Sequence, residues 1–222
     1  MQKISKIRNM HPMVYEKTRD GEVLYDIFSR LVKDRIIFLS GEEGICCDDA
    51  VTASATLLFL DHQSKTKPIS IYINSPGGTV TDGLYTIYDT MQSISAPIKT
   101  VCMGQACSAA AVLLGAGSKG MRFAFENAEI MIHELQVGGN GGTASEVLRE
   151  SVRVKRLNDK IIKTIADHCG QKFEKVKADV EHDFFMSAEE ALEYGLIDGI
   201  VKKAKSLPSL PQKVTGKRKI KT

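Results

Sequence analysis

The sequence has no apolar run long enough to form a membrane-spanning helix. Such a helix needs about 18–20 consecutive, mostly apolar residues, and the apolar runs among the 222 residues are far shorter. Residues 1–11 include basic side chains but lack the apolar centre of a secretory signal. We therefore expect no secretion and no membrane partner, and we interpret residues 1–11 as an N-terminal arm or a removable pro-segment.

Paired cysteine motifs are also missing. The cysteines are odd in number, two are adjacent, and none forms a Cys-x-x-Cys pair. They are Cys46, Cys47, Cys102, Cys107 and Cys169. This pattern argues against a disulfide framework and against a zinc site, and it favours a reducing compartment such as the cytoplasm. We interpret Cys107, the neighbour of Ser108, as a small buried residue rather than a nucleophile.

Acidic residues are absent from the C-terminal segment. Residues 202–222 contain eight Lys or Arg and no Asp or Glu, whereas the rest of the chain carries 22 basic against 27 acidic residues. A basic tail can bind nucleic acid, but this one has no aromatic side chain to stack on bases. We therefore expect a mildly acidic body, a disordered tail at 206–222, and no nucleic-acid partner.

Two glycine patterns lack the surroundings of a nucleotide-binding loop. Gly115, Gly117 and Gly120 match a dinucleotide-binding string, but they follow a predicted helix instead of a strand. Gly78 and Gly83 have the spacing of a phosphate loop, but the next residues are Leu and Tyr, not Lys and Ser or Thr. We reject both patterns as cofactor sites.

Predicted strands alternate with predicted helices, which is typical of βαβ units. The strands are predicted at residues 35–39, 69–73, 98–103, 129–133 and 197–201. The helices are predicted at 25–32, 48–60, 79–94, after Ser108, at 144–168 and at 187–195, the last two with capping boxes and terminal glycines. Because βαβ crossovers join parallel strands, the pattern predicts an α/β fold with a mainly parallel sheet.

Ser108 stands at a predicted junction between a strand and a buried helix. Backbone N–H groups at a helix start have no helical partner, so they can stabilise an oxyanion that forms when a serine attacks a carbonyl. On these residues alone, the simpler interpretation is that Ser108 only caps the helix.

A nucleophilic serine needs a base, and the base needs an acid that orients it. His133 ends a predicted strand that follows the serine helix, and strand ends of a parallel sheet meet at one edge, so His133 can reach Ser108. The other histidines lie in less suitable places, at positions 11, 62, 168 and 182. The residues leave the acid open among Asp179, Glu181 and Asp183.

Several separated motifs resemble one family in sequence and order. They are Tyr-Asp-Ile-Phe-Ser-Arg-Leu at 25–31, Arg-Ile-Ile-Phe-Leu at 35–39, Tyr-Ile-Asn-Ser-Pro-Gly-Gly at 72–78, Ile-Tyr-Asp-Thr-Met-Gln at 87–92, Gly-Gln-Ala-Cys-Ser at 104–108, Met-Ile-His at 131–133, Asp-Phe-Phe-Met-Ser-Ala-Glu-Glu-Ala at 183–191 and Glu-Tyr-Gly-Leu-Ile-Asp at 193–198. Over residues 12–202 the chain resembles the ClpP family, the serine peptidase subunits of ATP-dependent Clp proteases (peptidase family S14).

The resemblance implies a ClpP/crotonase-like fold and assigns roles to individual residues. Ser108 matches the family's nucleophile, His133 its general base, and Asp183 its orienting acid. The family's oxyanion hole corresponds here to the backbone N–H groups of Gly78 and Ala109. A glycine at such a place lets bare backbone approach a carbonyl closely.

The resemblance also implies that a glycine-rich segment binds extended peptide as an added strand, which suits broad specificity. The matching residues are Gly77, Gly138, Gly139 and Gly141. The chain departs from the family pattern at Ala109 and Ala110, where Met and Gly are usual, and at Glu134 and Leu135, where Gln and Pro are usual. These departures leave the triad intact but bear on substrate preference.

As an assembly, the family forms two stacked heptameric rings, a 14-mer, in which the helix at 144–168 would interleave between rings. A Clp-type AAA+ unfoldase would supply unfolded polypeptides and hydrolyse the ATP, so no cofactor and no metal is expected for this chain. We expect a peptidase domain at 12–205 that cleaves these polypeptides to short peptides.

Two other functions compete with this interpretation. An inactive ClpP paralogue in a mixed ring would have lost triad residues, and this chain keeps all three. An acyl-CoA enzyme of the related crotonase type would share the oxyanion hole but has no use for a Ser-His-Asp set.

Overall fold

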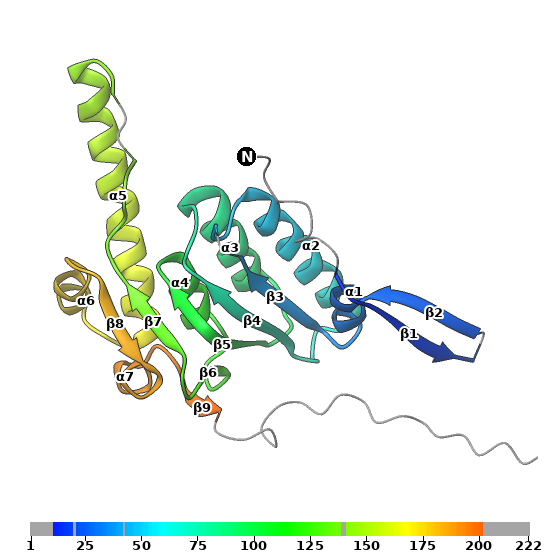
Figure 1. Cartoon of the computed structure of the whole chain (residues 1–222). Coiled ribbons are helices and arrows are strands. Elements are labelled where there is room, and N and C mark those ends of the chain that lie inside the picture. The colour runs from blue at the N-terminus through cyan, green and yellow to red at the C-terminus, as the bar shows by residue number, and fades with distance from the viewer. Residues whose placement is uncertain (1–10, 20, 42, 139–140, 202–222) are drawn as a thin grey trace, which may run out of the picture.

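The computed structural model describes residues 11–19, 21–41, 43–138 and 141–201, which Figure 1 shows in colour. Nearly all of the predicted arm at 1–11, Gly139 and the predicted tail at 206–222 lie outside the described residues. The described part forms a seven-stranded sheet with helices packed around it, and a separate two-stranded hairpin.

The seven-stranded sheet is parallel except for one strand pair. Its path runs through β3 (Ile36–Ser40), β4 (Ile69–Ser75), β5 (Ile98–Cys107), β6 (Arg122–Phe125) and β9 (Gly199–Val201). β7 (Glu129–Ile132) pairs in parallel with β5, and β8 (Phe184–Ser187) pairs antiparallel with β7. The predicted α/β fold with a mainly parallel sheet is confirmed.

The helices follow the strands closely in sequence. They are α1 (Ile27–Val32), α2 (Cys47–Gln63), the π-helix η1 (Val80–Leu84), α3 (Tyr85–Ser93), α4 (Ala109–Gly115), α5 (Ala144–Cys169), α6 (Phe173–Asp179) and α7 (Ala188–Tyr194). α4 is buried at every position, which fits its wholly small and apolar sequence. α5 extends well beyond the sheet (Figure 1).

Both predicted capping boxes are present. At the start of α5, the Thr143 N–H donates to the Glu146 carboxylate at 2.8 Å, and the Glu146 N–H donates to the Thr143 hydroxyl. Ser187 and Glu190 make the same reciprocal contacts at the start of α7. Because each box satisfies two N–H groups that have no helical partner, the sequence fixes the starts of these two helices locally.

The first helix begins later than predicted, because a hairpin precedes it. β1 (Met13–Thr18) pairs antiparallel with β2 (Gly21–Asp26), and the hairpin projects away from the sheet (Figure 1). Tyr25 and Asp26 therefore belong to β2 rather than to the helix. Asp26 ends the strand and also caps α1, accepting from the N–H groups of Phe28 and Ser29. The hairpin was not predicted, because its strands are largely exposed and lack an alternating apolar pattern.

Short elements between the predicted ones were also missed. β6 and β8 have four residues each, and α6 has seven, so each is too short to give a distinct apolar pattern in the sequence. β9 begins at Gly199 instead of at 197, because the N–H groups of Leu196 and Ile197 still bond to the carbonyl of Ala191. β5 continues beyond the predicted end at 103 to Cys107, so it leads directly into Ser108.

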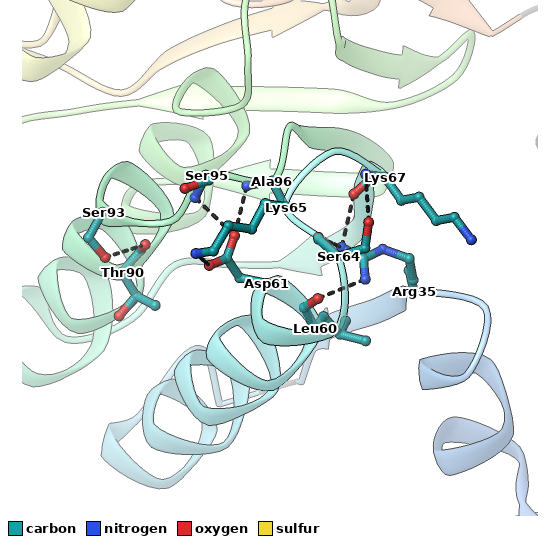
Figure 2. A network of polar contacts seen from close by, with 10 residues as sticks. All are labelled: Arg35, Leu60, Asp61, Ser64, Lys65, Lys67, Thr90, Ser93, Ser95 and Ala96. Carbon is teal, nitrogen blue, oxygen red and sulfur yellow. Dashed lines mark hydrogen bonds and ion pairs between the residues drawn. The ribbon is translucent and has the colours of Figure 1, made fainter.

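A polar network joins the amino ends of the strands (Figure 2). Arg35, which precedes β3, donates to the carbonyl of Leu60 at 2.8 Å and so binds the last turn of α2. Asp61 on the same helix accepts from the N–H groups of Ser95 and Ala96, both at 2.9 Å, just before β5. These contacts hold the segments that lead into β3 and β5 against the C-terminal end of α2.

Candidate active site

The carboxyl ends of β4, β5 and β7 lie side by side at one edge of the sheet. Ser108 follows β5, and its N–H donates to the carbonyl of Met131 in β7 across 2.8 Å. His133 is the first residue after β7. Ser108 and His133 line a single pocket of about 630 Å³. The strand order therefore brings the candidate nucleophile and the candidate base to one place.

Ser108 has a strained backbone. Its φ of 53° and ψ of −124° lie in a region that residues with a side chain rarely adopt. Such a conformation costs about 1–3 kcal/mol and is concentrated at functional sites. Within the described residues, the Ser108 side chain accepts no hydrogen bond from α4, so the interpretation of Ser108 as an ordinary helix cap is wrong.

A tight turn between a strand and a helix is a known way to present a serine hydroxyl. The usual sequence sign of that turn, Gly-x-Ser-x-Gly, is missing here. The strain at Ser108 could therefore not be predicted from the motif. The small residues Ala106 and Ala109, which are both buried, were the available sign that the backbone is crowded at this turn.

The β7–β8 pair brings His133 and Asp183 together. The antiparallel ladder ends with Ile132 opposite Phe184, so the next position along it sets His133 opposite Asp183. Nδ1 of His133 lies 3.8 Å from Oδ1 of Asp183, which is within ion-pair range and longer than a hydrogen bond. Catalytic contacts of this kind are often long before substrate binds. The His133 side chain is 11% exposed and that of Asp183 is 53% exposed.

The two other candidate acids are placed differently. The Asp179 carboxylate accepts from the Tyr194 hydroxyl and from the Lys175 ammonium, both at 2.7 Å. Glu181 is exposed on the turn between α6 and β8. Asp183 is therefore the acid that the geometry favours, which the residues alone had left open.

Gly77 lies against Ser108 and Gly78 lies against Ile45, both in a backbone conformation that requires glycine. Gly77 has a φ of 131°, and a Cβ atom on it would come within 2.8 Å of the Ser108 Cβ. The Ile45 N–H donates to the Gly77 carbonyl at 2.7 Å, and the Ile45 carbonyl accepts from the Thr79 N–H at 3.1 Å. Ile45 therefore holds this loop through two backbone hydrogen bonds, a role that could not be predicted from the sequence.

Two backbone N–H groups remain available beside Ser108. Within the described residues, the N–H groups of Gly78 and Ala109 donate no hydrogen bond, and both residues line the same pocket as Ser108. The Ala109 N–H belongs to the first turn of α4, where helical N–H groups have no partner. Such donors beside a reacting carbonyl can stabilise the negative charge that develops on its oxygen.

A model of the Clp protease family matches residues 19–204. The chain belongs to the Clp protease family. The match spans nearly all of the described residues, and it confirms the resemblance to ClpP-type peptidases that the separated motifs indicated. The family consists of serine peptidases, so the pocket that contains Ser108 and His133 is the natural candidate for the active site of this Clp protease chain.

Among the four glycines assigned to peptide binding, the three that the structure describes do not line this pocket. Gly77 packs against Ser108, whereas Gly139 lies outside the described residues. Gly141 lines a second, open pocket along α5, of about 960 Å³. Gly138 is exposed, with no described atom within 4 Å of a Cβ built on it. In the described residues, the wall of the first pocket beyond His133 is formed by residues 134–137.

Cys107 has the properties of a buried residue, as the sequence indicated. It is 5% exposed, and burial raises the pKa of its thiol, with a further contribution from the negative charges of Glu129 and Asp183. Burial also raises the pKa of Cys102 to about 12. These thiols stay protonated at neutral pH, so they do not compete with Ser108 as nucleophiles.

Over the described residues, no group of three or more His, Cys, Asp or Glu side chains has the arrangement of a metal site. Over the same residues, none of the helices combines the length and the apolar character that crossing a membrane requires.

Proposed function

We propose that the chain is the proteolytic subunit of an ATP-dependent Clp protease, a serine endopeptidase with Ser108 as nucleophile, His133 as general base and Asp183 as orienting acid. The observation that carries the proposal is the meeting of a strained serine, a histidine and two free backbone donors at one edge of the sheet. Family membership adds the reaction class.

Each group in the proposed site has a role in one step of peptide hydrolysis. Nδ1 of His133 faces Asp183, which leaves Nε2 to accept the Ser108 proton as Oγ attacks a peptide carbonyl. The oxyanion of the tetrahedral intermediate accepts hydrogen bonds from Gly78 and Ala109. His133 then donates its proton to the leaving amine, and the C–N bond breaks. A water molecule then attacks the acyl-enzyme ester while His133 takes its proton, and His133 returns that proton to Ser108 Oγ as the ester C–O bond breaks.

We propose that the substrate peptide binds in an extended conformation by main-chain pairing with the protein. The residues of the protein proposed to lie along the peptide are Gly77, Gly138, Gly139 and Gly141. An extended peptide satisfies its own N–H and carbonyl groups by pairing with protein backbone, whatever its sequence. The interior of the pocket is apolar, because α4 and α5 contribute Val112, Val154, Leu157 and Ile161. A bulky apolar side chain of the substrate fits there.

The protein is proposed to work as two stacked heptameric rings in the cytoplasm, with a Clp-type AAA+ unfoldase that delivers unfolded polypeptide. Exposed apolar side chains on α2 and α5 support an assembly, since isolated chains rarely leave so many uncovered. They are Val51, Leu58 and Phe59 on α2, and Val147, Leu148 and Val152 on α5. Because the unfoldase hydrolyses the ATP, this chain is proposed to need no cofactor, with residues 12–205 as its peptidase domain.

The test is a comparison of the purified chain with its Ser108→Ala variant. Both are run on a sizing column and assayed with short fluorogenic peptides. We expect the variant to lose about 10⁴-fold or more in turnover, because the nucleophile is gone, and to keep the assembly. Comparable turnover by the variant would contradict the assignment. If the wild type is inactive and monomeric and activity appears only when a second subunit is added, the chain is instead an inactive paralogue that works in a mixed ring.

A further inference from the structure

The wall of the catalytic pocket carries an unusual set of charges. The acidic residues that line it are Glu43, Asp82 and Glu134. Arg153 is the one permanently charged basic residue among the described residues that line it. The pocket therefore combines an apolar interior, formed by α4 and α5, with an acidic border.

Arg153 does not neutralise this border, because its charge is already paired. Its guanidinium donates to both carboxylate oxygens of Glu150, at 2.8 and 2.6 Å. The two residues lie one turn apart on α5, so the pair is internal to the helix. A bidentate pair of this kind presents little net charge to a ligand.

The three carboxylates, in contrast, have no basic partner among the described residues. Among the described residues, none of Glu43, Asp82 and Glu134 forms a salt bridge with a basic side chain. A hydrogen bond from Thr79 and backbone hydrogen bonds lower the pKa of Asp82, so this carboxyl group is ionised at neutral pH. The described residues hold no cluster of three or more His, Cys, Asp or Glu side chains that could bind a metal ion.

Of the three carboxylates, that of Glu134 is best placed to contact a bound peptide. It directly follows His133, and its N–H donates to the carbonyl of Val180 at 2.9 Å, which fixes the backbone at this point. Its side chain is exposed and lines both the catalytic pocket and the adjoining pocket along α5. A peptide that extends from Ser108 into the second pocket would pass this carboxylate.

We propose that Glu134, supported by Glu43 and Asp82, is a specificity-determining residue that selects peptide segments in which a Lys or Arg neighbours the apolar side chain bound in the pocket. This inference rests on the proposed peptidase function and names its substrate class. The occupant of the acidic border is a basic side chain of the substrate, because the apolar interior and the exposed carboxylates fit the two parts of such a segment.

The expected preference is modest and sensitive to salt. Ion pairs that remain partly exposed contribute enough for about a two- to fivefold change in an equilibrium or rate. Screening shortens the range of such attractions to about 3 Å at 1 M salt, compared with about 10 Å at 0.1 M. The preference should therefore fade as salt is added, whereas binding of the apolar side chain should not.

The experiment uses quenched fluorogenic peptides of equal length, each with one leucine as the bulky apolar residue. Lys, Gln or Glu is placed in turn at each position beside the leucine, and kcat/KM is measured at low and at high salt. We expect Lys to exceed Gln by about two- to fivefold, and Gln to exceed Glu, at one or more positions, with the differences shrinking at high salt.

Glu134→Gln and Glu134→Lys then test the residue. We expect Glu134→Gln to reduce the ratio of kcat/KM for the Lys peptides to kcat/KM for the Gln peptides, and Glu134→Lys to favour the Glu peptides. Glu193→Gln is the matched control, since this exposed glutamate on α7 lies outside the pocket lining and its replacement changes net charge equally. A sizing column verifies that each variant assembles like the wild type.

Failure of the inference is distinct from failure of the proposed function. If no peptide is cleaved in a Ser108-dependent way, the proposed function is wrong. If Ser108-dependent cleavage shows equal kcat/KM for Lys, Gln and Glu peptides, or if Glu134→Gln keeps the wild-type preference, the charge selection is overturned and the peptidase assignment stands.

Discussion

The residues of the proposed triad differ in how firmly the fold holds them. Ser108 is fixed by its strained backbone and by its hydrogen bond to Met131. His133 is mostly buried at the end of β7, whereas more than half of the Asp183 side chain is exposed. Asp183 is therefore the member whose contribution most needs measurement.

Replacing Asp183 by Asn should lower kcat by about 10²–10⁴-fold. An amide cannot stabilise the imidazolium of His133 as a carboxylate does, and it favours the wrong tautomer of the ring. Turnover of a fluorogenic peptide measures the effect. Asp179→Asn is the control, since the Asp179 carboxylate contacts Tyr194 and Lys175, and it should stay near wild-type turnover. Wild-type kcat in the Asp183 variant would show that another group orients the base.

The residues of the site could be predicted to different degrees. Ser108 and His133 could be selected from their places at predicted strand ends. The choice of Asp183 came from the resemblance, because nothing in residues 179–183 by itself reveals which acid faces β7. The strain at Ser108 and the support from Ile45 could not be predicted, because both depend on contacts between segments far apart in sequence.

At the scale of elements, the C-terminal end of α5 is joined to the sheet by polar contacts. Arg122 in β6 forms a bidentate pair with Asp198, at 2.9 and 2.6 Å, and also donates to the carbonyl of His168 at 2.9 Å. The His168 ring bonds to the Tyr88 hydroxyl at 3.0 Å. These contacts connect α5 to β6, to α3 and to the segment before β9.

The pKa of His168 leads to a pH dependence of stability. Burial, followed by the positive charge of Arg122, lowers this pKa below its usual value of 6.5, while Asp167 opposes the shift. The unfolded chain then binds a proton at a higher pH than the folded chain does. The contribution of neutral His168 to stability is therefore complete above pH 6.5 and is lost as the pH falls below it.

We expect His168→Gln to flatten the fall in stability between about pH 6.5 and pH 5. The measurement is the urea midpoint of wild type and variant at a fixed protein concentration, compared at several pH values. His62→Gln is the control, because that histidine lies on the exposed side of α2. Equal slopes of stability against pH in wild type and His168→Gln would contradict the argument.

Helices whose ends carry capping signals were predictable, whereas several short elements without such signals were not. The capping boxes and terminal glycines marked α5 and α7 correctly, because these signals act within one turn of the chain. β8 has four residues, and its pairing with β7 is decided by tertiary contacts. The pairing of β7 with β8 also brings Asp183 to His133. The same tertiary contact therefore explains why β8 was not predicted and why the residues alone did not identify the acid.

At the scale of the whole molecule, exposed apolar surface marks where neighbouring subunits are proposed to bind. In the first half of α5, Leu148 is 69% exposed and Val152 is 72% exposed. The helix extends beyond the body (Figure 1). Burial of such side chains by a second ring would remove this apolar surface from water.

Leu148→Glu combined with Val152→Glu should separate the rings. Burying two carboxylates in an apolar contact costs more than the contact returns, so we expect a particle of about half the wild-type mass by analytical ultracentrifugation. Lys177→Glu, at an exposed position on α6, is the control and should sediment like the wild type. An unchanged particle in the double variant would place the ring contact elsewhere.

Covalent labelling can measure whether His133 activates Ser108. A fluorophosphonate probe is incubated with the wild type, Ser108→Ala and His133→Ala, and each intact mass is measured. Attack by Oγ forms the Ser–phosphorus bond and expels fluoride, while His133 takes the proton. We expect one adduct, located on Ser108, in the wild type only. Labelling of His133→Ala at the wild-type rate, or an adduct elsewhere in the wild type, would contradict it.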